Sequence, residues 1–297
     1  MPPDFDPNFQ VPHWGWWIVL YFFTGGVTGG TYFAAAWLDL FGEPADRRAM
    51  RLGFLVTLPL LILCAIFLIA DLGQPLRFWH MIFESENFPL PILKLYSPMS
   101  FGSGLLAMFG LLAFLSFADV LFFGSRLLHA PGNLIGKVVS LVGGIAGLGL
   151  AGYTGVLLNV GNDPVWGNSP WISALFLFSG MSTGIALLLL LARSAPRTTV
   201  DKLAEADNYM MLFELISLVV FLVSLGAVGA RFIFTSPVLI LFAVVVVLGL
   251  LVPLGLHWRP RLVGGQRMAS VAAALLVLIG GFVLRWAVLA GPQGIGL

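Results

Sequence analysis

The sequence predicts an all-α integral membrane protein with eight transmembrane helices. Of its 297 residues, 59% are hydrophobic and only 10% are charged, whereas a soluble domain carries about 25% charged residues. Apolar runs recur along the whole chain, and each approaches the roughly 20 residues that cross a bilayer as a helix. The runs are continuous and do not alternate with polar residues. This pattern excludes a transmembrane β-barrel, and the composition excludes an ordinary soluble enzyme.

Eight apolar runs give the order of the predicted helices. A short segment, residues 1–15, precedes the first run, where Trp14, Trp16 and Trp17 mark a membrane boundary. The predicted spans are residues 16–38, 51–70, 99–123, 135–159, 171–192, 208–230, 234–256 and 268–290. The connections on the predicted inner side are short, so chemistry in water must belong to another chain.

The distribution of lysine and arginine predicts the orientation, because cytoplasmic loops carry the excess of both. One side receives Arg47, Arg48, Arg51, Arg126, Lys137, Arg193, Arg197, Lys202, Arg259, Arg261 and Arg267. The other side receives Arg77, Lys94, Arg231 and Arg285. We therefore expect the first side to be cytoplasmic and both termini to lie outside.

Short motifs recur in the same order in both halves of the chain. Residues 24–29 of the first span resemble residues 179–184 of the fifth. Arg-Phe ends the second and sixth spans, and Ser-Pro opens the third and seventh. The order predicts a duplicated unit, with one four-helix bundle over residues 16–160 and another over residues 161–297. Chance similarity is the alternative, because the motifs are short.

Small residues at four-residue spacing predict where the helices pack closely. In membranes, helices associate through glycine and alanine, which let two backbones approach each other. Such residues are Gly25, Gly26, Gly29, Gly30 and Ala34 in the first span, and Gly143, Gly147, Ala151 and Gly155 in the fourth. We expect both sets to form packing surfaces.

The composition limits cofactors and partners. A single cysteine, Cys64, excludes a disulfide framework and an iron–sulfur cluster held by this chain alone. The four histidines place no pair of imidazoles inside facing spans, so we expect neither haem nor a resident metal. A net charge of +1 argues against a nucleic-acid partner, which needs a basic face. Electrons that pass through the chain would need a diffusible carrier, such as a membrane quinone.

Ionisable groups within a membrane are costly and usually functional. Several polar residues are expected at one level near the outer face: Asp71, Arg77, Tyr153, Arg231 and Arg285. A quinone head group needs hydrogen-bond partners for its two oxygens and a base for its protons. A tyrosine, a carboxylate and an arginine can supply these. The structural alternatives are arginines that extend to the interface and an Asp71–Arg77 pair at a helix end.

Other polar residues lie inside the spans or toward the inner face. They are Thr28 and Asp39 in the first span, Asp207 and Glu214 in the sixth, and His257 at the end of the seventh. We interpret them as candidates for a hydrated proton path. The alternatives are threonine hydroxyls that bond to their own helix carbonyls and a Glu214 that is hydrogen-bonded for structural reasons.

Three ordered segments resemble those of the NrfD/polysulfide-reductase membrane-subunit family. Residues 71–78, Asp-Leu-Gly-Gln-Pro-Leu-Arg-Phe, resemble its D-L-G-R-P-x-R-F segment. Residues 97–103 resemble S-P-M-S-x-G-S, and residues 153–158 resemble Y-T-G-x-L-L. The eight spans fit as well, so the resemblance covers nearly the whole chain. Gln74 stands where the family usually has arginine, which lowers the local charge.

The resemblance implies a haem-free, quinone-reactive membrane anchor of a multi-subunit respiratory oxidoreductase, in a bacterial or archaeal cytoplasmic membrane. It implies electron exchange at the outer face between quinol and an adjacent iron–sulfur (ferredoxin-like) subunit, itself connected to a molybdopterin catalytic subunit. Menaquinone is preferred to ubiquinone, and no activity is expected of the chain alone. Tyr153 would bond to a quinone oxygen, and Asp71 would accept a proton beside Arg77. Further candidate quinone-binding residues are His13, Arg231 and Arg285.

The resemblance also implies that protons could cross the membrane, with Asp39, Asp207, Glu214 and His257 forming the inner part of the path. Two other classes remain alternatives. A secondary transporter suits repeats and intramembrane charges, although transporter repeats are often inverted and this repeat is parallel. A passive anchor would merely tether a redox complex.

Overall fold

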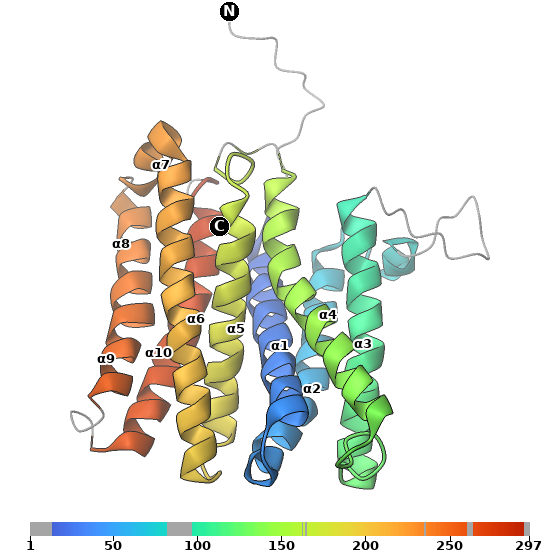
Figure 1. The fold of residues 1–297 in the computed structure, drawn as a ribbon. Helices are drawn as coiled ribbons and strands as arrows, with labels where there is room; N and C mark the ends of the chain where they lie inside the picture. Colours follow the sequence, from blue (N-terminus) through green and yellow to red (C-terminus); the bar gives the residue numbers. More distant parts are fainter. Residues whose placement is uncertain are drawn as a thin grey trace, which may run out of the picture.

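The computed structural model describes residues 14–81, 97–161, 163, 165–234, 236–259 and 264–293. Within these residues, eight helical segments are long and apolar enough to cross a membrane (Figure 1). The first four are α1 (Trp16–Phe41), α2 (Arg47–Asp71), α3 (Pro98–Phe123) and α4 (Leu134–Asn159), with the short helices η1 (Pro44–Asp46) and η2 (Pro75–Met81) beside α2. The next two are α5 (Trp171–Leu191) and α6 (Arg197–Ser224), which leads into the short α7 (Gly226–Ile233). The seventh consists of α8 (Ser236–Val244), the π-helical η4 (Val245–Leu251) and α9 (Val252–Trp258), and the eighth is α10 (Gln266–Ala290).

The prediction of an all-helical membrane protein with eight spans is confirmed. The clearest difference is in α6, which begins at Arg197 and not near residue 208. Its first turns are polar, so hydropathy alone misses them. They are held by contacts with η1, where Thr199 Oγ1 donates to Asp46 Oδ1 at 2.6 Å and Lys202 Nζ donates to Asp46 Oδ2 at 3.1 Å.

Helices α1 and α5 form the centre of the structure. They pack against each other, α1 also packs against α2 and α4, and α5 also packs against α4, α6 and α10 (Figure 1). The expected small-residue surfaces are present: a methyl group on Gly29 would overlap the carbonyl of Gly147, and one on Gly30 would overlap that of Gly180. Gly25 makes no close contact of this kind, because a methyl group on it would meet nothing within 4 Å.

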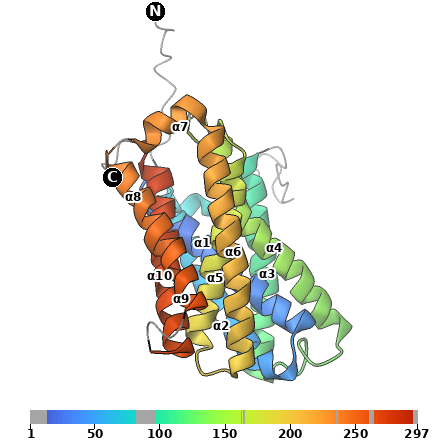
Figure 2. The same ribbon diagram turned by 60° about the vertical axis from the view of Figure 1, so that its left-hand side comes forward.

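The helix contacts follow the same order in the two halves. In the first half, α1 contacts α2 and α4, and α3 contacts α2 and α4. In the second half, α5 contacts α6 and α10, and the α8–α9 segment lies beside α10 and contacts α6 (Figure 2). The division into two four-helix bundles stays a prediction, and this matching order supports it.

The start of α1 and the end of α10 lie at the same end of the helical assembly. Here the backbone N–H of Trp14 donates to Gln293 Oε1 at 3.0 Å. We refer to this end as the predicted outer end, since the arginine and lysine distribution assigns it to the outside. The opposite end, with the α1–α2, α3–α4 and α5–α6 connections (Figure 1), is the predicted inner end. The sidedness itself stays a prediction.

Candidate functional site

A cavity of about 90 Å³ lies at the predicted outer end among α1, α2, α3 and α4. Asp71 and Tyr153, which are 82 residues apart in the chain, both line it. Its remaining wall is mostly apolar and is formed by Trp14, Ile18, Tyr21, Leu68, Leu72, Met99, Gly102, Ser103 and Leu157. The fold therefore brings two of the predicted site residues to one small cavity near the membrane boundary.

Tyr153 reaches this cavity because α3 has no side chain at the point of contact. The Tyr153 ring lies directly against Gly102, where a methyl group would overlap the ring. The phenolic hydroxyl donates a hydrogen bond to the carbonyl of Pro98, in the first turn of α3. The side chain is almost fully buried. Its hydroxyl is thus the polar tip of an otherwise apolar wall.

Asp71 is the last residue of α2, and its side chain is exposed. The chain then turns through residues 72–74 into η2, which carries Arg77. The Arg77 side chain is also exposed, and within the described part of the chain no ion pair joins it to Asp71. An Asp71–Arg77 ion pair therefore does not explain why an aspartate ends α2. The Asp71 carboxylate is available to a molecule in the cavity.

Sequence reasoning missed Tyr21, which lines the same cavity from α1. The signal was present, because Tyr21, Thr24 and Thr28 recur at helical spacing on one face.

Cys64 of α2 continues this polar face of α1: its Sγ lies 3.2 Å from Thr24 Oγ1 and 3.7 Å from Thr28 Oγ1. The hydroxyl of Thr28 also donates to the Thr24 carbonyl at 2.6 Å. The Thr28 hydroxyl therefore bonds to a carbonyl of its own helix, which is the structural alternative to a role in a proton path.

Arg285 is fully buried, with its guanidinium directed at α5. Its Nη1 donates to Ser179 Oγ at 2.5 Å and to the Gly281 carbonyl at 2.9 Å. The guanidinium carbon lies 5.4 Å from the centre of the Phe176 ring. Glu214 of α6 lies near both Ser179 and Arg285. A buried arginine and a buried carboxylate from two other helices thus approach the same serine.

Asp207 of α6 continues this polar network through Ser182, which lies one turn from Ser179 on α5. Ser182 Oγ donates to Asp207 Oδ1 at 2.7 Å, and Asp207 is fully buried. Its second oxygen, Oδ2, has no hydrogen-bond partner within the described residues. The neighbouring Asn208 bonds through Oδ1 to His257 Nδ1 at 2.7 Å. His257 of α9 therefore contacts α6 at the residue next to Asp207, and Ser182 is a partner of Asp207 that sequence reasoning did not single out.

Asp39 belongs to a separate cluster at the predicted inner end. Its Oδ2 accepts from Ser140 Oγ at 2.6 Å and lies 2.9 Å from His129 Nδ1. His129 comes from the α3–α4 connection, yet it is buried and stacks on Phe54. Sequence reasoning treated His129 as a loop residue, because nothing local shows that this loop folds inward.

The remaining predicted site residues are not brought to the cavity. Arg231 is exposed on α7, and neither Arg231 nor Arg285 is among the residues that line the cavity. His13 lies outside the described residues. No group of three or more histidine, cysteine, aspartate or glutamate side chains in the described residues could hold a metal ion. The expectation of no haem stays a prediction.

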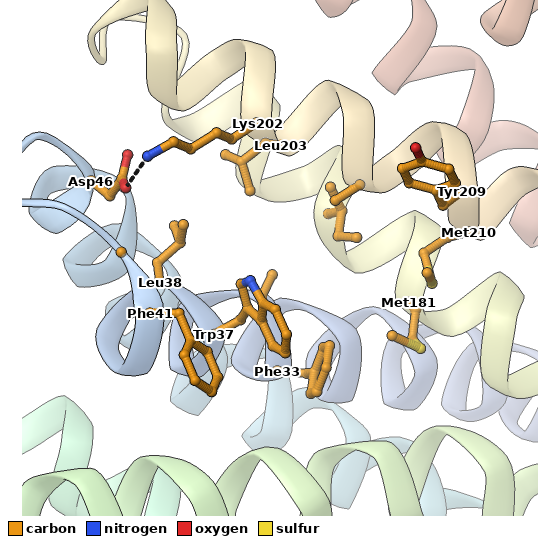
Figure 3. Close-up of a pocket in the computed structure, with 14 residues that line it drawn as sticks. Phe33, Trp37, Leu38, Phe41, Asp46, Met181, Lys202, Leu203, Tyr209 and Met210 are labelled. Carbon is orange, nitrogen blue, oxygen red and sulfur yellow. Dashed lines mark hydrogen bonds and ion pairs between the residues drawn. The ribbon is translucent and has the colours of Figure 1, made fainter.

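A larger cavity, of about 400 Å³, lies among α1, α5 and α6 at the predicted inner end (Figure 3). Aromatic side chains of α1, including Phe33, Trp37 and Phe41, form one wall. Its two charged residues, Asp46 and Lys202, bond to each other at 3.1 Å. None of the predicted site residues that the structure describes lines this cavity, and the two charged residues among its described lining are already paired. It is therefore the weaker candidate for a site of proton or electron exchange.

Comparison with known proteins decides the family. The family described as Polysulphide reductase, NrfD matches residues 6–295. The chain belongs to this family. It is 29% identical to Protein NrfD of Escherichia coli (strain K12), over 74% of this chain and 73% of that protein. It is 28% identical to a protein of Wolinella succinogenes that is named as a chain of polysulfide reductase, over 68% of this chain and 66% of that protein.

A third relative matches over a shorter stretch. It is a protein of Mesobacillus selenatarsenatis that is named as a subunit of selenate reductase, and it is 29% identical over 25% of this chain and 18% of that protein. Two of these relatives are thus named as parts of reductases. The chain is therefore a multi-pass membrane protein and a membrane subunit of an oxidoreductase complex, as the three motifs predicted.

Proposed function

We propose that this subunit exchanges electrons between a membrane quinol and an adjacent iron–sulfur subunit at the predicted outer end, without haem of its own. The observation that carries the proposal is that Asp71 and Tyr153 line one cavity among membrane-spanning helices. A quinol loses two electrons and two protons when it becomes a quinone. A phenolic donor and a carboxylate at one cavity match its oxygen atoms and its protons.

The cavity fits a quinone head group only after a small rearrangement. Its volume is about 90 Å³, less than the roughly 150 Å³ of an engineered cavity that binds benzene. The hydroxyl of Tyr153 is bonded to Pro98, so it must leave this carbonyl to bond to a quinone oxygen. Because Asp71 is exposed, the head group can enter from that side without displacing buried charge.

In this proposal each residue of the chain has a distinct part. Tyr153 bonds to one oxygen of the quinol and orients the ring. Asp71 accepts one proton, from the other oxygen, and releases it at the outer face, helped by the positive charge of Arg77 close by in the chain. The second proton passes from the Tyr153-bonded oxygen to bulk water at the same face. His13 is a second hydrogen-bond partner. Arg231 and Arg285 act through their charge, not by contact with the cavity.

The partners follow from the same proposal. The chain holds no redox centre in this scheme, so an iron–sulfur (ferredoxin-like) subunit must receive the electrons at the outer end. A molybdopterin subunit then carries out the terminal chemistry, and menaquinol is the preferred electron donor. Purification of the native complex in mild detergent, with mass spectrometry of its chains and lipids, tests this. An iron–sulfur protein with bound quinone is expected, and a lone chain without quinone would contradict the proposal.

Two substitutions at the cavity test the chemistry in the purified complex. Tyr153→Phe should lower kcat/KM for quinol about three- to tenfold, because one hydrogen bond contributes about 0.5–1.5 kcal/mol. Asp71→Asn should lower it by about 10²–10⁴, the usual range for general acid–base catalysis. Tyr209→Phe, on the wall of the larger cavity, is the matched control. Normal turnover in both cavity variants would instead indicate a passive anchor.

We also propose that the buried polar residues conduct protons. The groups are Thr28, Asp39, Asp207, Glu214 and His257, with the α6 members linked through α5 hydroxyls. Support comes from the burial of Asp207 and Glu214 and from the unpartnered Oδ2 of Asp207 among the described residues. Buried carboxylates in membranes are rare and often serve proton relays.

The ratio of protons to electrons in reconstituted vesicles tests the proton path. Glu214→Gln should lower this ratio and leave quinol oxidation intact, because Glu214 does not line the Asp71–Tyr153 cavity. Glu205→Gln, on the exposed surface of α6, is the matched control. An unchanged ratio in Glu214→Gln would refute the path. Substrate-dependent uptake by vesicles that hold this chain alone would favour a secondary transporter instead.

A further inference from the structure

The cavity at Asp71 and Tyr153 adjoins a second, apolar groove between α2 and α3. This groove has a volume of about 290 Å³ and shares two wall residues with the cavity, Leu68 and Ser103. Phe78 of η2 lies along the groove as well. The two spaces therefore lie side by side, with Leu68 and Ser103 in the wall that they share.

The groove runs from the cavity toward the middle of the membrane. Its wall on α2 extends from Ile69 back to Leu61, which corresponds to about 12 Å at 1.5 Å per residue. Near its far end, Leu61 Cδ2 would lie 3.5 Å from a methyl group on Gly110 of α3. The groove thus begins beside the proposed head-group cavity and ends where the two helices come together.

The wall of the groove is almost entirely aliphatic or aromatic. Among the described residues of this wall, Ser103 is the one that bears a hydroxyl, and Ser103 Oγ donates to the Ser100 carbonyl of its own helix at 3.0 Å. Ile62 is 52% exposed and Phe78 is 46% exposed, so the groove opens toward the lipid. Two alanines, Ala65 on α2 and Ala107 on α3, leave the space between the helices open.

We propose that this groove holds the isoprenoid tail of the quinone whose head group occupies the cavity. The inference rests on the proposed function, and the position of the groove directly beside the cavity, at Leu68 and Ser103, selects the tail over an unrelated lipid. A tail in the groove gains little from hydrophobic burial, since the bilayer is equally apolar. The groove contributes instead through its shape. It gives the tail a route to the bilayer while the head group occupies the cavity.

A bulky side chain introduced into the groove tests the proposed tail site. The assay compares two quinols that have the same naphthoquinol ring system and differ in the tail. Ala107→Phe should raise KM for a long-tailed menaquinol about tenfold or more, the scale expected when a bulky group enters occupied space. The KM for tail-less 2,3-dimethyl-1,4-naphthoquinol should stay unchanged. Ala118→Phe lies on the same helix outside the groove and is the matched control. Assays use the native complex in vesicles.

The outcomes are distinct. A groove that holds only bilayer lipid leaves both KM values unchanged in Ala107→Phe, and this would overturn the inference. An equal rise for both quinols would show damage to the head-group cavity and would overturn it too. A wild-type complex that oxidises neither quinol would refute the proposed function itself. A menaquinone with a diazirine on its tail gives a test without substitution: label is expected on residues 61–69 and 103–107, and label confined to other helices would refute the tail path.

Discussion

Replacing Ser179 by alanine removes a hydroxyl that links two membrane helices close to a buried carboxylate of a third. Ser179 of α5 accepts a hydrogen bond from Arg285 of α10 at 2.5 Å, and Glu214 of α6 lies nearby. All three side chains are at least 97% buried. In Ser179→Ala the buried guanidinium of Arg285 loses one hydrogen-bond partner, so the variant should be less stable.

The size of the loss follows from this hydrogen bond. Side-chain hydrogen bonds within membranes contribute about 0.6 kcal/mol on average and about 1.7 kcal/mol at most. One lost bond therefore predicts a decrease of about 0.6–1.7 kcal/mol in the free energy of unfolding. The loss is not larger, because Arg285 keeps its bond to the Gly281 carbonyl at 2.9 Å and its position beside the Phe176 ring.

Unfolding of the purified chain by sodium dodecyl sulfate in mixed micelles, followed by tryptophan fluorescence, measures this difference. Ser270→Ala is the matched control, since Ser270 is also buried but its hydroxyl donates only to the Gln266 carbonyl of its own helix, at 3.0 Å. If Ser179→Ala and Ser270→Ala agree within about 0.5 kcal/mol, the usual limit of additivity, the bridging role of Ser179 is refuted.

Two glycine substitutions give further predictions. In Gly102→Ala the new methyl group overlaps the Tyr153 ring, so quinol turnover should fall at least as far as in Tyr153→Phe; normal turnover would show that Tyr153 does not need its present position. Gly29→Ala places a methyl group against the Gly147 carbonyl of α4 and should lower the free energy of unfolding by about 1–3 kcal/mol. Gly25→Ala, which meets nothing, is its control, and equal unfolding midpoints would contradict the predicted α1–α4 packing surface.

The sequence alone predicted the membrane class, the number of spans and most of their boundaries. These features depend on local composition, because a helix that crosses lipid must be apolar over about 20 residues whatever its neighbours are. The first turns of α6 escaped this reasoning, since their stability depends on Asp46 of a different segment. The three motifs also sufficed to indicate the family.

The position along a span does not determine which way a side chain points. Arg285 was expected with Asp71 and Tyr153 near the outer face, yet it faces the interior, where Ser179 and the Phe176 ring receive it. His129 was expected in a loop, yet it is buried against Asp39.

What the sequence determined by itself is therefore the set of membrane helices and the small residues along which α1 and α4 approach each other. Only the tertiary structure decided which polar groups meet, because a buried charge is stable only where side chains from other helices supply its hydrogen bonds. Ser179, Ser182 and Tyr21 are ordinary residues in the sequence. They gain a role only when the packing of α1, α5, α6 and α10 places them beside a charge or a cavity.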